Sequence, residues 1–158
     1  MNLVEDFKVV QGYCSTLWGA LDGADWIEMK NAHKIHTIIN TRNLTTLVTF
    51  TPKVASDVAG TGSSAVAGGC KWWTCDAPGT LDRFDASTSV TTLATTDGAA
   101  RGIHVCTYDP AQAASSNDCF SMGFSSQTAA GTGTLEVTYI IESRYKGYRA
   151  IIATTSST

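Results

Sequence analysis

The stretch TLEVTYIIES, residues 134–143, shows the clearest alternation of apolar and polar side chains in the chain. Leu135, Val137, Tyr139 and Ile141 fall on one side of an extended backbone, and the residues between them are mostly polar. Successive side chains of a strand point to opposite faces of its sheet, so a period of two predicts a half-buried strand. This segment therefore favours a β-sheet that packs one face against a core.

Several other segments are short, rich in β-branched or aromatic residues, and bounded by turn-forming residues, which is typical of strands. They are residues 33–40, 44–51, 70–75, 89–95, 102–108, 119–125 and 148–154. We expect a hairpin across residues 40–43 and one helical turn in the connector 108–118. The Gly-, Ser- and Ala-rich residues 54–69 predict a surface loop.

The composition agrees with an all-β fold. The 158 residues include 23 Thr and 14 Ser, and only 16% are charged. Thr is β-branched and favours extended backbone. About seven to nine short strands with no long helix predict one domain, a β-sandwich or jelly roll with long Gly/Ser/Thr-rich loops. Residues 1–20 are expected to form an N-terminal arm or short helix, and residues 21–158 the sandwich domain.

Charge and hydropathy disfavour two classes of partner. The net charge is −3 and there is no basic run, so nucleic acid is not expected as a direct partner. No apolar segment approaches the roughly 18 residues that span a bilayer, so no membrane partner is expected. The first residues, MNLVEDFKVV, carry acids where a secretory signal needs positive charge, and we expect folding in a cytoplasm.

The segment CKWWTC, residues 70–75, could be a thiol site or a strand. Four residues separate Cys70 from Cys75, whereas redox and zinc motifs usually place two between cysteines. In a strand these two thiols would point to opposite faces. A metal site would need His104 and Cys106, which share a face, together with Cys70, Cys75 or Cys119. Buried free thiols are the simpler interpretation, and no metal is expected.

The adjacent tryptophans of this segment also fall on opposite faces. We therefore expect Trp72 and Trp73 to differ sharply in burial, with one in the core. The exposed one would serve as a sugar platform or as an anchor in a protein interface.

No arrangement of residues predicts catalysis. His33, His36 and His104 are not accompanied by a GxSxG nucleophile motif or another recognisable catalytic unit. The glycine-rich GTGSSAVAGG, residues 60–69, lacks the Lys-Ser/Thr of a phosphate loop. We expect no catalytic residues, no cofactor and no enzymatic activity.

Four stretches together resemble a family of small virion proteins of tailed bacteriophages and prophages that decorate or cement the capsid. They are DWIEMKNAHKIHTII (25–39), CKWWTCDAPGTLDRFDASTSV (70–90), GIHVCTYDPAQA (102–113) and DCFSMGFSSQTAAGTGTLEVTYIIESRYKG (118–147), which includes an Arg-Tyr pair. The resemblance extends over roughly residues 24–150. The cysteines and the Trp pair depart from the family pattern.

The resemblance implies a structural virion protein that binds the major capsid protein, bridges its subunits on the capsid exterior, and is assembled in the host cytoplasm. Symmetry favours a homodimer or homotrimer as the unit applied to the shell. Aromatic residues and Arg supply rigid contact area, which suggests a set of interface residues. They are Trp18, Trp26, Trp72, Trp73, Arg144, Tyr145 and Tyr148.

Three alternatives remain open. Exposed Trp and the Asp-rich segment 75–85 would suit a carbohydrate- or receptor-binding β-module. Another head or tail component of a virion would also be small and β-rich. A thiol- or zinc-dependent enzyme would have to be built on His104 or Cys106.

Overall fold

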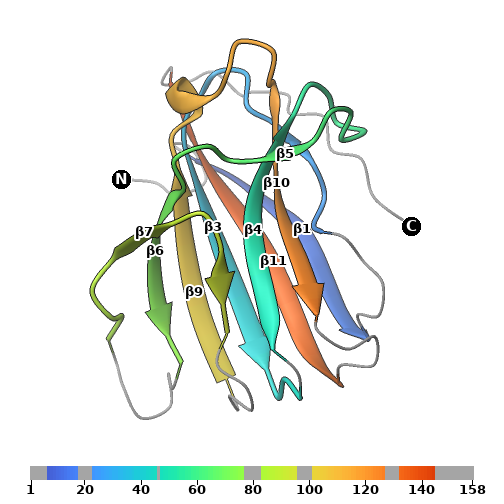
Figure 1. Ribbon diagram of the computed structural model, residues 1–158, viewed down its shortest axis with the longest axis vertical. Helices are drawn as coiled ribbons and strands as arrows, with labels where there is room; N and C mark the ends of the chain where they lie inside the picture. The colour runs from blue at the N-terminus through green and yellow to red at the C-terminus, as the bar shows by residue number, and fades with distance from the viewer. Residues whose placement is uncertain are drawn as a thin grey trace.

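The chain folds into two antiparallel β-sheets that pack face to face, as the ribbon in Figure 1 shows. This computed structural model describes residues 7–17, 23–45, 47–76, 83–95, 101–126 and 132–144. The predicted all-β sandwich is confirmed. No helix in these ranges is long and apolar enough to cross a membrane.

The larger sheet has six strands, in which segments far apart in the chain are neighbours. Their spatial order is β1 (Phe7–Leu17), β11 (Thr132–Ser143), β3 (Ala32–Arg42), β9 (Arg101–Tyr108), β6 (Cys70–Cys75) and β7 (Thr88–Val90). The smaller sheet consists of β2 (Ile27–Glu28), β10 (Cys119–Ser126), β4 (Val48–Ala55) and β5 (Ser64–Ala65), and β8 (Leu93–Ala94) pairs with β4.

The core lies between the sheets and is held by aromatic contacts across them. Tyr108 of the larger sheet stacks on Phe120 of the smaller at a centroid distance of 5.0 Å, and Tyr139 meets the same ring edge-on at 6.1 Å. Trp72 is fully buried, and its indole N–H donates to the carbonyl of Val90 at 3.3 Å. Each such buried side chain contributes about 1.5–3 kcal/mol to the free energy of folding.

Tyr139 also links the two sheets by hydrogen bonds. Its hydroxyl accepts from the backbone N–H of Met122 at 3.0 Å and donates to the carbonyl of Asp25 at 3.2 Å. Burial raises the pKa of this hydroxyl, so it stays protonated and able to donate. The inward alternation predicted for residues 134–143 is confirmed, since Leu135, Val137, Tyr139 and Ile141 are all buried.

β1 contains a register shift between Gln11 and Tyr13. The residue between them is Gly12, where an added Cβ would lie 2.3 Å from a ring carbon of Tyr139. Only glycine fits at this close approach, so the strand passes over the tyrosine ring at the bulge.

Four local expectations need correction. The expected hairpin across residues 40–43 is wrong, because β3 pairs with β11 and β9 whereas β4 pairs with strands of the other sheet. Residues 89–95 do not form one strand but contribute to β7 and β8, one in each sheet. Residues 7–17 are a paired edge strand instead of a separate arm or helix. The described residues form eleven strands, more than the expected seven to nine, because four of them are only two or three residues long.

Other expectations hold. The helical turn in the connector is present as a 3₁₀ turn, Pro110–Gln112, capped by the Asp109 carboxylate, which accepts from the N–H of Ala111 at 2.9 Å. The strands expected over residues 33–40, 70–75, 102–108 and 119–125 correspond to β3, β6, β9 and β10. The strand expected over residues 148–154 lies outside the described residues.

Candidate interaction face

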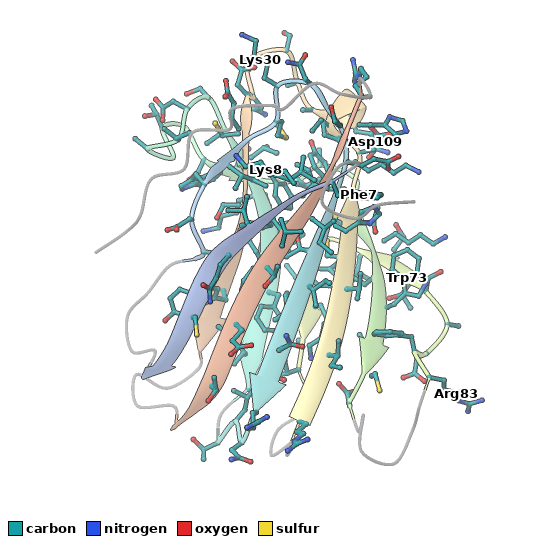
Figure 2. The ribbon with its side chains drawn as sticks, turned by 180° about the vertical axis from the view of Figure 1, so that it is seen from behind. Phe7, Lys8, Lys30, Trp73, Arg83 and Asp109 are labelled. Carbon is teal, nitrogen blue, oxygen red and sulfur yellow. The ribbon has the colours of Figure 1, made fainter. Side chains whose placement is uncertain are left out.

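The candidate site is the surface of the six-stranded sheet that faces away from the core, which we call the outer face. Figure 2 looks onto it, with β1, β11, β3, β9 and β6 in front and Trp73 labelled on β6. The second sheet packs on the opposite side, and no described strand packs on the outer face. Any chemistry or contact on this face depends on which outward side chains the register brings together.

Apolar side chains gather across the middle of the outer face. Ile38 of β3 lies opposite Val105 of β9, which lies opposite Trp73 of β6. Ile103 lies two residues from Val105 on β9, and Val9 of β1 lies opposite Ile140 of β11. We call the whole set the apolar stripe: Val9, Ile140, Ile38, Val105, Ile103 and Trp73. Val9 is 50% exposed and the other five are half-buried.

Lys71 lies over one face of the Trp73 ring. Its ammonium nitrogen is 5.2 Å from the ring centroid, within the range of a cation–π contact. The ammonium group therefore occupies one face of the indole ring. A flat ligand such as a sugar ring would have to displace Lys71 to stack there.

Polar residues border the stripe on the side of β9 and β3. His36 Nδ1 is 3.0 Å from the hydroxyl of Thr107. Burial lowers the pKa of His36, and Lys34 lowers it further, while Glu142 acts in the opposite direction. The imidazole is therefore neutral at pH 7 and adds no positive charge to the stripe.

A hollow of about 350 Å³ lies at one end of the outer face, where β3 ends and β9 and β11 begin. It is walled by Asn40, Arg42, Arg101, Ile103, Thr134 and Glu136, with Thr41 and Gly102 forming its floor. An added Cβ at Gly102 would lie 2.7 Å from Oγ1 of Thr41 and 2.8 Å from Nε2 of His104 beneath the sheet. Gly102 therefore faces inward with Thr41 and His104, and a larger side chain at this position would collide with them beneath the sheet.

The thiols are placed for packing. Cys70 belongs to the core, whereas Cys75 lies in register with Ile103 on the opposite face of β6, as the alternation predicts. Burial, with a hydrogen bond to Cys70, raises the pKa of Cys106 well above its usual range. Burial also raises the pKa of Cys119 to about 11. Thiolates are the nucleophiles and metal ligands, so these groups are poorly suited to either role.

His104 is likewise an interior residue. Its side chain is 2% exposed, and its Nδ1 lies 3.9 Å from a carboxylate oxygen of Asp76. Burial lowers the pKa of the imidazole and Asp76 partly offsets the effect. Within the described ranges, no three His, Cys, Asp or Glu side chains are grouped closely enough to hold a metal ion.

Comparison with known proteins assigns no family. No protein-family model matches the chain, and no curated protein matches it. A solved structure, the SPBc2 prophage-derived protein YomS, is similar at a TM-score of 0.47 and 12% sequence identity, over 87% of this chain and 94% of that chain. A similarity of this size assigns no function to the chain.

The predicted interface residues that the structure describes are Trp26, Trp72, Trp73 and Arg144, and they do not share one surface. Trp72 belongs to the core and offers no surface, because its side chain is fully buried. Trp73 is half-exposed on the outer face, so the predicted difference in burial between the two tryptophans is confirmed. Trp26 precedes β2 of the other sheet, where an added Cβ at Gly60 would lie 2.6 Å from its indole nitrogen.

Of the remaining predicted interface residues, the structure describes Arg144. Arg144 is exposed just after the strand, and its backbone N–H donates to the carbonyl of Asn31 at 2.8 Å. The interface role of Arg144 stays a prediction. Trp18, Tyr145 and Tyr148 lie outside the described residues.

Sequence patterns gave no indication that the arginines of the hollow lie together. Arg42 falls in the turn predicted over residues 40–43 and Arg101 just before the strand predicted over residues 102–108, and such positions are ordinary for surface charges. The only available signal was the rarity of arginine in a chain with 16% charged residues. Arg42 and Arg101 are close because β3 pairs with β9, and no local sequence pattern predicts this pairing.

Proposed function

We propose that this protein is a structural virion protein that binds a shell of major capsid protein through its outer face and bridges neighbouring capsid subunits. The proposal joins the sequence resemblance of four segments to capsid-decorating proteins with the geometry of one surface. The observation that carries it is the apolar stripe on a sheet face that no described element covers.

The stripe has the composition of an interface centre. Val105 and Ile38 supply rigid β-branched surface, and Trp73 supplies a large aromatic ring with a polar edge. Interfaces concentrate binding energy in aromatic residues such as Trp73, and the surrounding apolar contacts exclude water from them. A stable contact of standard size covers about 800 Å² on each partner. A sheet face is broad and flat, which suits contact with a shell.

Bridging would act mechanically. Each copy that contacts two capsid subunits adds contacts that must break before the subunits separate, and the copies repeat over the shell. Application as a homodimer or homotrimer would repeat the stripe by symmetry. The shell would then open at a higher temperature when the protein is bound.

The surroundings of Trp73 favour a protein partner over a carbohydrate. Lys71 already lies over the indole at 5.2 Å, so a sugar ring would have to displace a cation–π contact. A protein side chain can pack beside the ring edge and leave this contact in place.

The test is co-sedimentation of the purified full chain with assembled shells of the major capsid protein encoded in the same genome. Binding and a higher shell-opening temperature are expected, with no retention on a glycan array. Retention on glycans without binding to shells would instead identify the carbohydrate-binding module.

Two matched substitutions test whether the outer face is the surface that binds the shell. Val105→Asp puts a charge in the centre of the apolar stripe and should abolish co-sedimentation. Ser125→Asp puts the same charge at an exposed position on β10 of the other sheet and should leave it unchanged. Equal binding by both variants would show that the outer face is not the contact.

A further inference from the structure

Two arginines oppose each other across adjacent strands at the hollow. Arg42, the last residue of β3, is directly in register with Arg101, the first residue of β9. Both side chains are exposed and both line the same hollow. Like charges directly opposite on an antiparallel pair are destabilising, so this arrangement disfavours the empty site.

The carboxylate that lines the hollow with the two arginines, that of Glu136, contacts another strand. Glu136 also borders the hollow, and its carboxylate accepts a weak hydrogen bond from the thiol of Cys14 on β1 at 3.9 Å. β1 lies on the far side of β11 from β3, so this contact turns the carboxylate away from the arginines. Within the described part of the chain, neither guanidinium has a carboxylate within ion-pair distance.

We propose that the hollow receives a carboxylate side chain, Asp or Glu, of a protein partner. A guanidinium presents its N–H groups in a planar fork that matches a carboxylate, and two opposed forks can hold one carboxylate between them. The amide of Asn40 and the hydroxyl of Thr134 border the same space and supply further donors. Binding of an anion would also remove the repulsion between the two arginines.

The surroundings favour a carboxylate carried by a protein over the phosphates of a nucleic acid. The chain carries a net charge of −3 and has no basic run that could follow a phosphate backbone, which disfavours an extended polyanion. Ile103 belongs both to the wall of the hollow and to the apolar stripe. A partner segment with an acidic residue beside apolar ones would fill both. This assignment to a protein deepens the proposed function and rests on it.

The first test uses a small probe on the full-length chain. N-acetyl-glutamic acid amide is titrated while NMR follows the arginine Nε–H signals of Arg42 and Arg101 and the backbone amides of Gly102 and Ile103. Saturable shifts are expected, lost in the Arg42→Gln/Arg101→Gln double variant and retained in Arg83→Gln, an exposed arginine outside the hollow. The absence of saturable shifts would overturn the proposal.

A parallel titration with inorganic phosphate separates the possible sources of the anion. Weaker binding of phosphate than of the carboxylate probe supports a carboxylate site. Tighter binding of phosphate would overturn it in favour of a phosphate site. Thermal unfolding provides a second readout, because each single Arg→Gln variant should be at least as stable as the wild type in buffer without the probe.

Co-sedimentation with shells then separates this inference from the proposed function. If the wild type binds shells, the double variant should bind roughly tenfold more weakly or worse. Equal binding by the double variant would overturn the role of the hollow and leave the proposed function standing. If the wild type does not bind shells, the proposed function fails, and so does the assignment of the carboxylate to a protein partner. The probe titrations then test only whether the hollow binds a carboxylate.

Discussion

Replacing Tyr139 with Phe tests how the two sheets are held together. The substitution keeps the buried ring and removes one hydroxyl, which accepts from the N–H of Met122 at 3.0 Å and donates to the carbonyl of Asp25 at 3.2 Å. A buried N–H left without its partner costs about 1–3 kcal/mol, and a second lost hydrogen bond adds about 1 kcal/mol. We expect Tyr139→Phe to reduce the free energy of unfolding by about 2–4 kcal/mol.

The chain supplies a matched control at Tyr13. Its hydroxyl oxygen is buried and has no hydrogen-bond partner among the described residues, although its ring packs on Phe124 at 4.9 Å. Tyr13→Phe removes the same hydroxyl without breaking a hydrogen bond, so it should be neutral or stabilising. The same chemical change is therefore expected to have opposite effects at the two positions.

Urea unfolding followed by tryptophan fluorescence measures both variants. With a slope of about 2 kcal/mol/M, the loss at Tyr139 should lower the unfolding midpoint by roughly 1–2 M, while the Tyr13 variant should match or exceed the wild type. Thermal midpoints should fall by about 5–15 °C for Tyr139→Phe. Equal midpoints for the two variants would refute the assignment of the inter-sheet hydrogen bonds.

Three further outcomes follow from burial and charge. The folded protein holds His104 at a lowered pKa, whereas the unfolded chain has the ordinary value of 6.5. The unfolded state therefore binds more protons below pH 6.5, and the free energy of unfolding should fall by up to about 1.4 kcal/mol per pH unit as the pH drops from 6.5 towards the folded-state pKa. Denaturant titrations across this range should show a flatter pH profile in His104→Asn. Trp72→Ala should cost about 3–5 kcal/mol in calorimetry, and Trp73→Ala clearly less, because only the first indole is fully buried; equal losses would contradict this placement. Of the five cysteines only Cys14 is exposed, so Ellman's reagent should titrate one thiol in the folded protein and five in denaturant.

Much of the secondary structure could be predicted from the sequence because it depends on local periodicity. The alternation at residues 134–143 marked the inward face of β11, and the parity of residues 70–75 separated the two tryptophans of β6. These inferences need only the geometry of an extended strand, in which adjacent side chains point in opposite directions. The β-branched composition likewise indicated the all-β class.

The predictions from local sequence patterns were wrong where the structure depends on which strands pair. Residues 40–43 have the composition of a tight turn, yet the chain crosses there from one sheet to the other, because β3 pairs with β9 and β11. Residues 7–17 lack a clean pattern and still form an edge strand, since their register shifts at Gly12 to pass the ring of Tyr139. A period of two indicates a strand but not its neighbour.

The candidate site shows the same division. Strand alternation alone places Ile103 and Val105 on one face of a strand and Trp73 on the face opposite Trp72. The grouping of these residues on one surface, and of Arg42 with Arg101, depends on tertiary pairing, because backbone hydrogen bonds and the fit of the core align strands that are distant in the chain. Local sequence determines which way a side chain points, whereas long-range pairing determines what it meets.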